Sequence, residues 1–459
     1  MMGLSSISTS ALALLLVLAG SATADTCTQN RLHTTYPAPV AADGWSYRLI
    51  AHGLQRPRSI LFDDSGALLV LESGKGVTRL TFNDSGGSCL GVKEHKTVVA
   101  NTALNHGLQI LNGSLLASTD NDVLSWRYDA GAGSVDTASQ QVLVTNMTNS
   151  GHKTRTLLVT SRSQLLVSRG SAGNADPAAV EKTTGHCHIR AFTPSSTTAD
   201  FASGGETVGW GLRNSVGIAE HPDGGIWSVE NSVDNLSRQG TDIHKDNPGE
   251  ELNYHGNVTN LRGANHGYPL CYALWGKDGF PNLGSLSVGD QFAVEAAEGV
   301  NVSPPTDAQC NTDYAAPALA FQAHTAPLDI VFDKNGSNAY ITFHGSWNRE
   351  SPVGYAVSRV AFANGRPVEG QASTQAVTDI LRNADISGCP SKCFRPVGLA
   401  WDSAGRLWFS SDSTGEIFVL AHGGDAFAGD GGDSGAGATR ASLAAIVGAV
   451  AASWLLTRI

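Results

Sequence analysis

The sequence predicts an all-β fold, a six-bladed β-propeller with four-stranded antiparallel blades around a central channel. The 459-residue chain holds 52 glycines and only 15% charged residues, a composition typical of a turn-rich β protein. A strand–turn–strand pattern also recurs six times along it. Its copies are separated by roughly 50 to 110 residues, which leaves room for two further strands in each blade.

Each copy joins an apolar run of period two, a turn containing Asp, Pro or Gly, and a second apolar run that closes on a polar residue. The clearest copies are residues 60–62 with 68–72 and residues 399–401 with 407–412. Four similar copies begin at Leu108, Leu157, Ile218 and Ile330, with second runs ending near Asp120, Arg169, Glu230 and His344. A β-sandwich would need shorter and more even spacing.

Both ends of the chain are predicted to be targeting segments. Residues 1–24 are expected to be a secretory signal peptide, because a short apolar run is followed by small residues that suit cleavage before Asp25. Residues 25–425 would form the propeller, and 426–440 a flexible linker with a glycosylphosphatidylinositol (GPI) attachment region. Residues 441–459 would be the hydrophobic signal that attachment removes. A short transmembrane tail is the alternative.

Glycosylation motifs and cysteines also indicate a secreted, extracellular protein. Asn-x-Ser/Thr acceptors lie at Asn83, Asn112, Asn146, Asn235, Asn257, Asn301 and Asn335, and they predict N-linked glycans. The 7 cysteines would tend to pair outside the cell. We expect Cys389 to pair with Cys393 and Cys271 with Cys310, and an odd cysteine must remain.

The repeat places polar side chains at one mouth of the channel, because the residues before the first strand of a hairpin and after its second strand lie at the same end. Those before the first strands are Arg56, Arg58, Asn105, His106, His152, Arg155, Arg213, Asn214, His324 and Arg395; those after the second strands are Glu72, Asp120, Glu230, His344 and Asp412. Converging guanidinium groups suit a polycarboxylate or a phosphate ligand. Individually, many of these side chains could instead satisfy strand ends. The net charge of −11 argues against a nucleic-acid partner.

Several motifs resemble those of a known family. They are Gly-Leu-Arg-Asn-Ser-Val-Gly from residue 211, Ile-Trp-Ser-Val-Glu-Asn from 226, Asn-His-Gly-Tyr-Pro from 265, His-Gly-Ser-Trp-Asn-Arg from 344 and Arg-Pro-Val-Gly-Leu from 395. Together they resemble the soluble quinoprotein sugar dehydrogenases, which use pyrroloquinoline quinone (PQQ) to oxidise glucose or L-sorbosone, and most closely the fungal PQQ-dependent pyranose dehydrogenases. The resemblance covers about residues 51–420, and the family's six-bladed propeller agrees with the repeat count.

The resemblance implies roles for particular residues. His152, in the motif Gly-His-Lys-Thr-Arg, would be the catalytic base, Arg213 and Asn214 would contact the cofactor, and Arg395 would meet a PQQ carboxylate. A catalytic Ca²⁺ would be held by two consecutive backbone carbonyls, which align with Ser232 and Val233. A further, structural Ca²⁺ site would lie near residues 250–253.

The chemistry of PQQ extends this set. Its three carboxylates could be neutralised by a ring of arginines, Arg58, Arg213, Arg349 and Arg395. His106 and His344 face the same mouth by the repeat argument, and Trp347 could either stack on the planar cofactor or wedge between two blades.

The expected function is oxidation of the anomeric or hemiacetal hydroxyl of a sugar, such as a pyranose or a sorbosone-like ketoaldose. A neutral His152 would take the hydroxyl proton while hydride moves to PQQ, and Ca²⁺ would polarise the quinone. Electrons would then pass to an external acceptor, a cytochrome or a quinone. Tyr268, Tyr272 and Trp275 could stack on the sugar ring.

Two other functions fit the same scaffold. A Ca²⁺-dependent, lactonase-type hydrolase would bind its metal through side chains such as Glu72, Asn214 and Glu230. A non-catalytic propeller that binds a partner at the cell surface would need no such site. NAD and FAD are not expected, because no dinucleotide fingerprint occurs in a βαβ setting.

Overall fold

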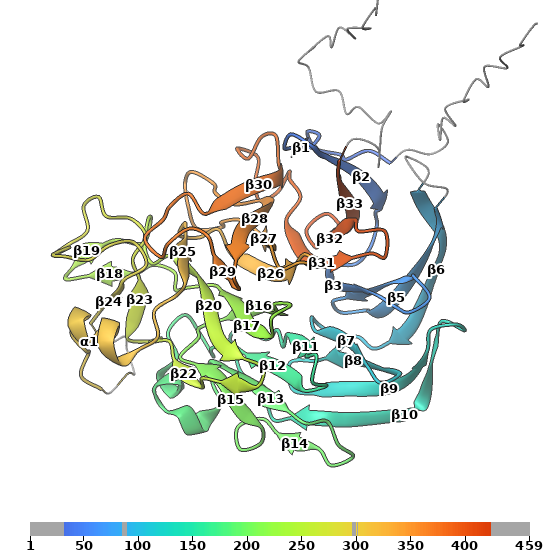
Figure 1. The fold of residues 1–459 in the computed structure, drawn as a ribbon, viewed down its shortest axis with the longest axis horizontal. Coiled ribbons are helices and arrows are strands. Elements are labelled where there is room, and N and C mark those ends of the chain that lie inside the picture. Colours follow the sequence, from blue (N-terminus) through green and yellow to red (C-terminus); the bar gives the residue numbers. More distant parts are fainter. Residues whose placement is uncertain (1–31, 85–89, 296–299, 301, 424–459) are drawn as a thin grey trace, which may run out of the picture.

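The computed structural model describes residues 32–84, 90–295, 300 and 302–423. Within these residues, six sheets of four or more strands surround a centre (Figure 1), which confirms the predicted six-bladed propeller. The predicted signal peptide, 1–24, and the GPI and C-terminal segments from 426 to 459 lie outside the described residues. None of the helices described is long and apolar enough to cross a membrane.

The first three blades follow one another along the chain. Blade one contains β3 (Pro57–Phe62), β4 (Leu68–Glu72), β5 (Gly76–Asp84) and β6 (Leu90–Ala100). Blade two contains β7 (Leu108–Leu111), β8 (Ser114–Ser118), β9 (Val123–Asp129) and β10 (Ser134–Thr145), with β14 (Ala199–Asp200) added in parallel. Blade three contains β11 (Leu157–Val159), β12 (Leu165–Arg169), β13 (His188–Phe192) and β15 (Glu206–Trp210), with β22 (Ala264–Asn265) added in parallel.

The other three blades carry more additions. Blade four contains β16 (Ser215–Glu220), β17 (Gly225–Glu230) and β20 (Glu250–Asn257), which pairs with both β21 (Asn260–Leu261) and β25 (Leu319–Phe321). Blade five contains β26 (Pro327–Phe332), β27 (Asn338–Phe343), β28 (Ala356–Ala363) and β30 (Val377–Arg382), with β1 (Val40–Ala41) and β29 (Arg366–Pro367). Blade six contains β31 (Pro396–Trp401), β32 (Leu407–Ser411), β33 (Glu416–His422) and β2 (Trp45–Ala51).

Blade six closes the ring with strands from both ends of the described chain. β2 is its outermost strand and pairs antiparallel with β33, from Trp45 opposite His422 to Ala51 opposite Ile417. This pairing gives the edge of β33 a partner and fastens the first strands to the last.

The second strand of each blade is buried on both faces. In β4, Leu68 and Val70 join a cluster with Trp408 of blade six, whereas Leu69 and Leu71 pack against blade two. These strands therefore read as continuous apolar runs, because neighbouring blades cover both faces. This agrees with the second apolar run of each repeat in the sequence.

A long excursion from blade four forms a lobe at the side of the ring, at the left of Figure 1. It contains β18 (Ser237–Arg238), β19 (Thr241–Asp242), β23 (Cys271–Ala273), β24 (Gln291–Ala293) and α1 (Asp307–Asp313). Both expected disulfides, Cys271–Cys310 and Cys389–Cys393, are confirmed, and the first ties β23 to α1. Cys187 is a buried free thiol. Cys27 and Cys89 lie outside the described residues.

The two disulfides should differ in their contribution to stability. The Cys271–Cys310 bridge joins residues 39 positions apart, so replacing both cysteines by serine should lower the free energy of unfolding by about 4 kcal/mol. The matched control replaces Cys389 and Cys393, only 4 positions apart, and should cost about 2 kcal/mol. Guanidinium unfolding measures both. A larger loss for the short loop would contradict this account.

Candidate active site

The six innermost strands line a central channel, which encloses a cavity of about 300 Å³. Its walls include Ser59 and Ile60 of β3, Leu108 of β7, Ile218 of β16, Asp329 of β26 and Leu399 of β31. His106 borders the same cavity. The repeat therefore leads to the arrangement that the sequence predicted, with side chains of several blades meeting around one channel.

A first cluster joins four blades at the carboxylate of Asp412. Arg58 of blade one donates from Nη1 to Asp412 Oδ2 at 2.6 Å, and His344 Nε2 of blade five lies 2.8 Å from Asp412 Oδ1. Arg58 Nε also donates to His106 Nδ1 at 3.4 Å. Sequence reasoning placed all four residues at this mouth.

Burial and charge set the protonation states of this cluster. Burial alone would raise the pKa of Asp412, but His344 and Arg58 outweigh it and hold that pKa below its usual range. Burial, helped by the positive charge of Arg58, lowers the pKa of His106 to about 3. Burial also lowers the pKa of His344, although Asp412 opposes this. The cluster therefore holds an ionised carboxylate and neutral imidazoles at neutral pH.

Arg395 braces the turn that carries His344. Its Nε donates to the carbonyl of His344 at 3.0 Å and its Nη2 to that of Gly345 at 2.9 Å. Its Nη1 forms no hydrogen bond with the described residues. One edge of this guanidinium thus remains for a ligand carboxylate.

A second cluster surrounds His152, in the loop before β11. Its Nδ1 lies 2.8 Å from Ser171 Oγ, in the loop after β12. A Cβ atom on Gly170 would come within 2.8 Å of both His152 Cβ and Asn214 Oδ1, so this glycine lets those two predicted site residues approach each other. Burial, followed by the charge of Arg213, lowers the pKa of His152 to about 4, which keeps the imidazole neutral at neutral pH.

Arg213 and Arg349 both form hydrogen bonds with neighbouring loops. Arg213 donates to both oxygens of Asn174, the carbonyl and the side-chain amide, and lies 3.2 Å from Asp234 Oδ2. Arg349 donates to the carbonyl of Lys245 and contacts Asp246. The structure therefore shows that both of these arginines hold neighbouring loops in place.

The predicted Ca²⁺ ligands have suitable chemistry. Neither the Ser232 nor the Val233 carbonyl accepts a hydrogen bond from any described residue, and carbonyl oxygens are donors that Ca²⁺ prefers. The segment is fixed by Ser232 N–H, which donates to the buried Glu250 carboxylate at 2.7 Å. The two carbonyls thus fit a hard cation. No cluster of three or more His, Cys, Asp or Glu that could hold a metal occurs among the described residues, including around residues 250–253.

The side chains that a hydrolase would use are occupied. Glu72 accepts hydrogen bonds from Lys75 Nζ at 2.6 Å, Thr78 and the N–H of Gln55. Glu230 accepts the N–H of Arg213 at 2.8 Å. These contacts favour structural roles for both carboxylates.

One expectation about aromatic residues was wrong, and one of two alternatives for another residue is excluded. Tyr268 and Tyr272 are each 4% exposed within the side lobe, so neither can stack on a sugar. Trp347 is 66% exposed, which excludes a wedge between two blades and leaves its indole free at the surface. The sequence did not indicate the burial or exposure of these side chains, because all three lie in segments outside the hairpin repeat.

Sequence reasoning also missed Ser171, Asn174 and Asp234. Asn174 and Asp234 join the loops of blades three and four through four hydrogen bonds. Asn174 Nδ2 donates to the Asp234 carbonyl, Asp234 N–H donates to Asn174 Oδ1, and Arg213 Nη2 donates to both side chains. Their only sequence signal is a position shortly after a predicted second strand.

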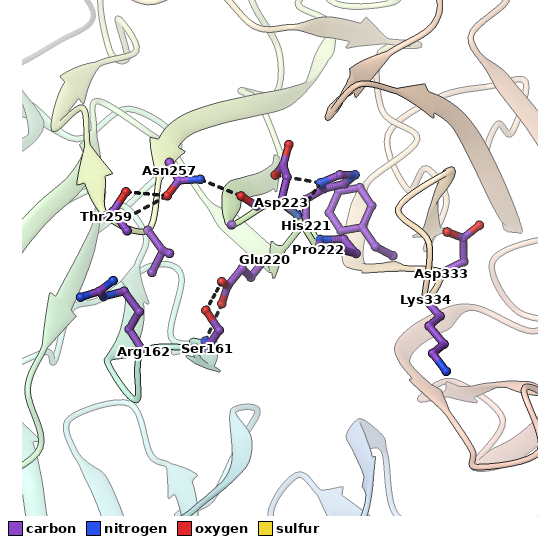
Figure 2. Close-up of a pocket in the computed structure, with 13 residues that line it drawn as sticks. Ser161, Arg162, Glu220, His221, Pro222, Asp223, Asn257, Thr259, Asp333 and Lys334 are labelled. Carbon is purple, nitrogen blue, oxygen red and sulfur yellow. Dashed lines mark hydrogen bonds and ion pairs between the residues drawn. The ribbon is translucent and has the colours of Figure 1, made fainter.

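A second cavity, of about 610 Å³, lies at the opposite ends of blades three to five (Figure 2). It is lined by the turns that join the first and second strands of these blades and by the turn between β20 and β21, whereas His152 precedes a first strand. Figure 2 shows Glu220 accepting two hydrogen bonds from Ser161, and Asn257, a predicted glycan acceptor, accepting two from Thr259. This cavity is therefore separate from the His152 cluster.

The chain is similar to characterised fungal proteins. A family model described as TrAA12-like matches residues 39–423. A PQQ-dependent sugar dehydrogenase of Hypocrea jecorina is 55% identical over 434 residues, covering 92% of this chain and 98% of the relative. A PQQ-dependent pyranose dehydrogenase of Coprinopsis cinerea is 35% identical over 402 residues, covering 83% of this chain and 54% of the relative. The chain thus spans about half of that second relative.

Solved structures agree with these matches. The calcium structure of the Trichoderma reesei Carbohydrate-Active Enzymes Family AA12 protein is 56% identical with a TM-score of 0.83, covering 86% of this chain and 99% of that one. The holo form of the pyranose dehydrogenase PQQ domain from Coprinopsis cinerea is 34% identical with a TM-score of 0.79, covering 85% and 98%. On both sequence and structure, the chain belongs to the TrAA12-like family of PQQ-dependent sugar dehydrogenases.

Proposed function

We propose that this protein oxidises the anomeric or hemiacetal hydroxyl of a sugar, with PQQ and Ca²⁺ bound at the channel mouth and His152 as the base. The observation that carries the proposal is a neutral His152 beside Asn214 in a propeller whose relatives are PQQ-dependent dehydrogenases. The protein would act outside the cell, held at its surface by a GPI anchor, and pass electrons to an external cytochrome or quinone.

The described residues suit both bound groups. PQQ would be held by Asn214, by the free edge of Arg395 and by the exposed face of Trp347. When bound, it supplies an ortho-quinone that accepts the hydride of the sugar carbon. The Ser232 and Val233 carbonyls would hold Ca²⁺, whose charge favours electron density on a nearby oxygen.

A side chain of the protein would accept the proton of the sugar hydroxyl. A neutral His152 has a lone pair ready to accept that proton at neutral pH. Burial, Arg213 and Arg155 all disfavour the imidazolium, whereas the backbone of Ser171 and the charge of Asp176 favour it. The protonated base would therefore release its proton readily after each turnover.

Arg155 would keep the loop of His152 in place. Its guanidinium is completely buried and donates to the carbonyl of His152 at 2.8 Å. It also donates to the carbonyls of Asp120, Met147 and Thr154. One side chain thus ties the base to the end of blade two.

Replacing the base should remove most of the activity while leaving the cofactor bound. We expect His152→Gln to lower kcat/KM by about 10² to 10⁴-fold, the usual contribution of a general base. Dye reduction with a panel of aldoses and ketoaldoses measures the loss, and a PQQ titration checks binding. His95→Gln, on the exposed part of β6, is the matched control. Full activity in His152→Gln would refute the assignment.

His152 should titrate at unusually low pH in the cofactor-free protein. Its pKa of about 4 lies below the model-peptide value of 6.5, so the ring should stay neutral on acidification until the pH approaches 4. Histidine NMR of ¹⁵N-labelled protein measures the midpoint. The reference is a histidine-containing model peptide, which titrates at about 6.5. Equal midpoints would contradict the proposed burial effect.

Removal of the bound groups should abolish the reaction. Protein stripped with a chelator should reduce the dye only after both PQQ and Ca²⁺ are restored, because each supplies chemistry that no side chain provides. Mg²⁺ is the matched control, since it is smaller and dehydrates reluctantly. Calcium-dependent lactone hydrolysis without PQQ binding would instead favour the hydrolase alternative.

A further inference from the structure

A short chain of hydrogen bonds begins at the side chain of His152. Its Nδ1 lies 2.8 Å from Ser171 Oγ, and that same Oγ lies 2.6 Å from the carbonyl oxygen of Gly173. Ser171 is fully buried. His152 Nε2 forms no hydrogen bond with any described residue.

Counting hydrogens assigns every donor in this chain. A carbonyl oxygen can only accept, and a serine hydroxyl has one hydrogen to donate. At 2.6 Å the Ser171 hydrogen must point to Gly173, since otherwise two lone pairs would face each other. Ser171 Oγ can then only accept from His152, so Nδ1 carries the hydrogen. In a neutral imidazole the lone pair is then on Nε2.

We propose that Ser171 is a positioning residue that fixes His152 as the Nδ1–H tautomer and so presents Nε2 as the base. The inference deepens the proposed function, since it rests on His152 being the base. On proton transfer from the sugar hydroxyl, Nε2 gains the hydrogen and Nδ1 keeps its own. The imidazole then carries one positive charge, and Ser171 neither gains nor loses a proton.

The backbone around Ser171 holds this geometry. Ser171 N–H donates to the Arg213 carbonyl at 2.8 Å, and its carbonyl accepts from His152 N–H at 2.9 Å. A Cβ atom on Gly151 would lie 2.5 Å from the Ala172 carbonyl carbon, so the two loops are in direct contact. His152 is therefore held by hydrogen bonds at both its ring and its main chain.

The choice of a hydroxyl partner has a chemical consequence. A carboxylate at Nδ1 would stabilise the imidazolium strongly. The carboxylate of this loop, Asp176, instead lies 2.7 Å from His186 Nδ1 and accepts the N–H of Ala172. Ser171 thus orients the ring without adding a negative charge, and His152 remains a weak base.

The tautomer can be measured without activity. Two-bond ¹H–¹⁵N NMR on the cofactor-free, full-length protein, with ¹⁵N-labelled histidine, separates the two tautomers. The His152 signals are those that disappear in His152→Gln. We expect wild-type protein to show Nδ1–H. In Ser171→Ala, which removes the acceptor, we expect a mixture of tautomers or a reversal.

Kinetics of the loaded enzyme provide the second measurement. Ser171→Ala should lower kcat by about 10 to 100-fold, less than loss of the base itself, with KM nearly unchanged. The matched control is Ser168→Ala, another buried serine of blade three, whose Oγ accepts the N–H of Thr156. It should alter neither the tautomer nor kcat.

The outcomes distinguish a failure of the base assignment from a failure of the positioning inference. Activity that survives in His152→Gln overturns the base assignment, whatever the tautomer. An inactive His152→Gln combined with an Nε2–H signal in wild type overturns the positioning inference alone. So does a Ser171→Ala variant that keeps both the wild-type tautomer and kcat.

Discussion

The pairing of β2 with β33 is the constraint on which the site depends. It joins the two ends of the described chain in blade six and so closes the ring in which six first strands meet. The ion pair between Arg58 and Asp412, at 2.6 Å, spans this closing seam, because one residue belongs to blade one and the other follows the second strand of blade six. An open ring would separate these two charges and remove the compensation that each gives the other. Closure therefore assembles the mouth as well as stabilising the fold.

Within the mouth, most charged groups form hydrogen bonds or ion pairs with other parts of the protein. Arg155 binds only carbonyls, Arg213 joins two loops, and Asp412 gathers Arg58 and His344. Such contacts compensate buried charges and hold neighbouring loops in one geometry, which is the condition for electrostatic catalysis. Among the described residues, the groups left open include one edge of Arg395, two carbonyls at Ser232 and Val233, and Nε2 of His152.

The sequence allowed the blade number and the convergence of mouth residues to be predicted, because both follow from a hairpin repeat in which every second strand is apolar. The repeat does not predict the structure of loops that lie outside it. Tyr268 and Tyr272 were expected to face a sugar but lie in the side lobe, where no periodicity indicates burial. Asn174, Asp234 and Ser171 were missed because single polar residues in loops look alike until folding brings them together. The hydrogen-bond partners of Arg213 and Arg349 could not be predicted for the same reason, because these partners also come together only when the chain folds.

The loop after β12 shows how environment separates two histidines. His186 has a carboxylate, Asp176, at Nδ1 and Arg169 at Nε2, so both its nitrogens are engaged with protein. His152 has a hydroxyl at Nδ1 and no hydrogen bond at Nε2 within the described residues. The first arrangement fixes a ring in the structure. The second leaves one lone pair available, with the ring held by an uncharged group, so the proton that arrives at Nε2 is bound weakly. Under the proposed function, a base regenerated in every turnover would need that weakness, which fits a loop whose carboxylate binds the other histidine.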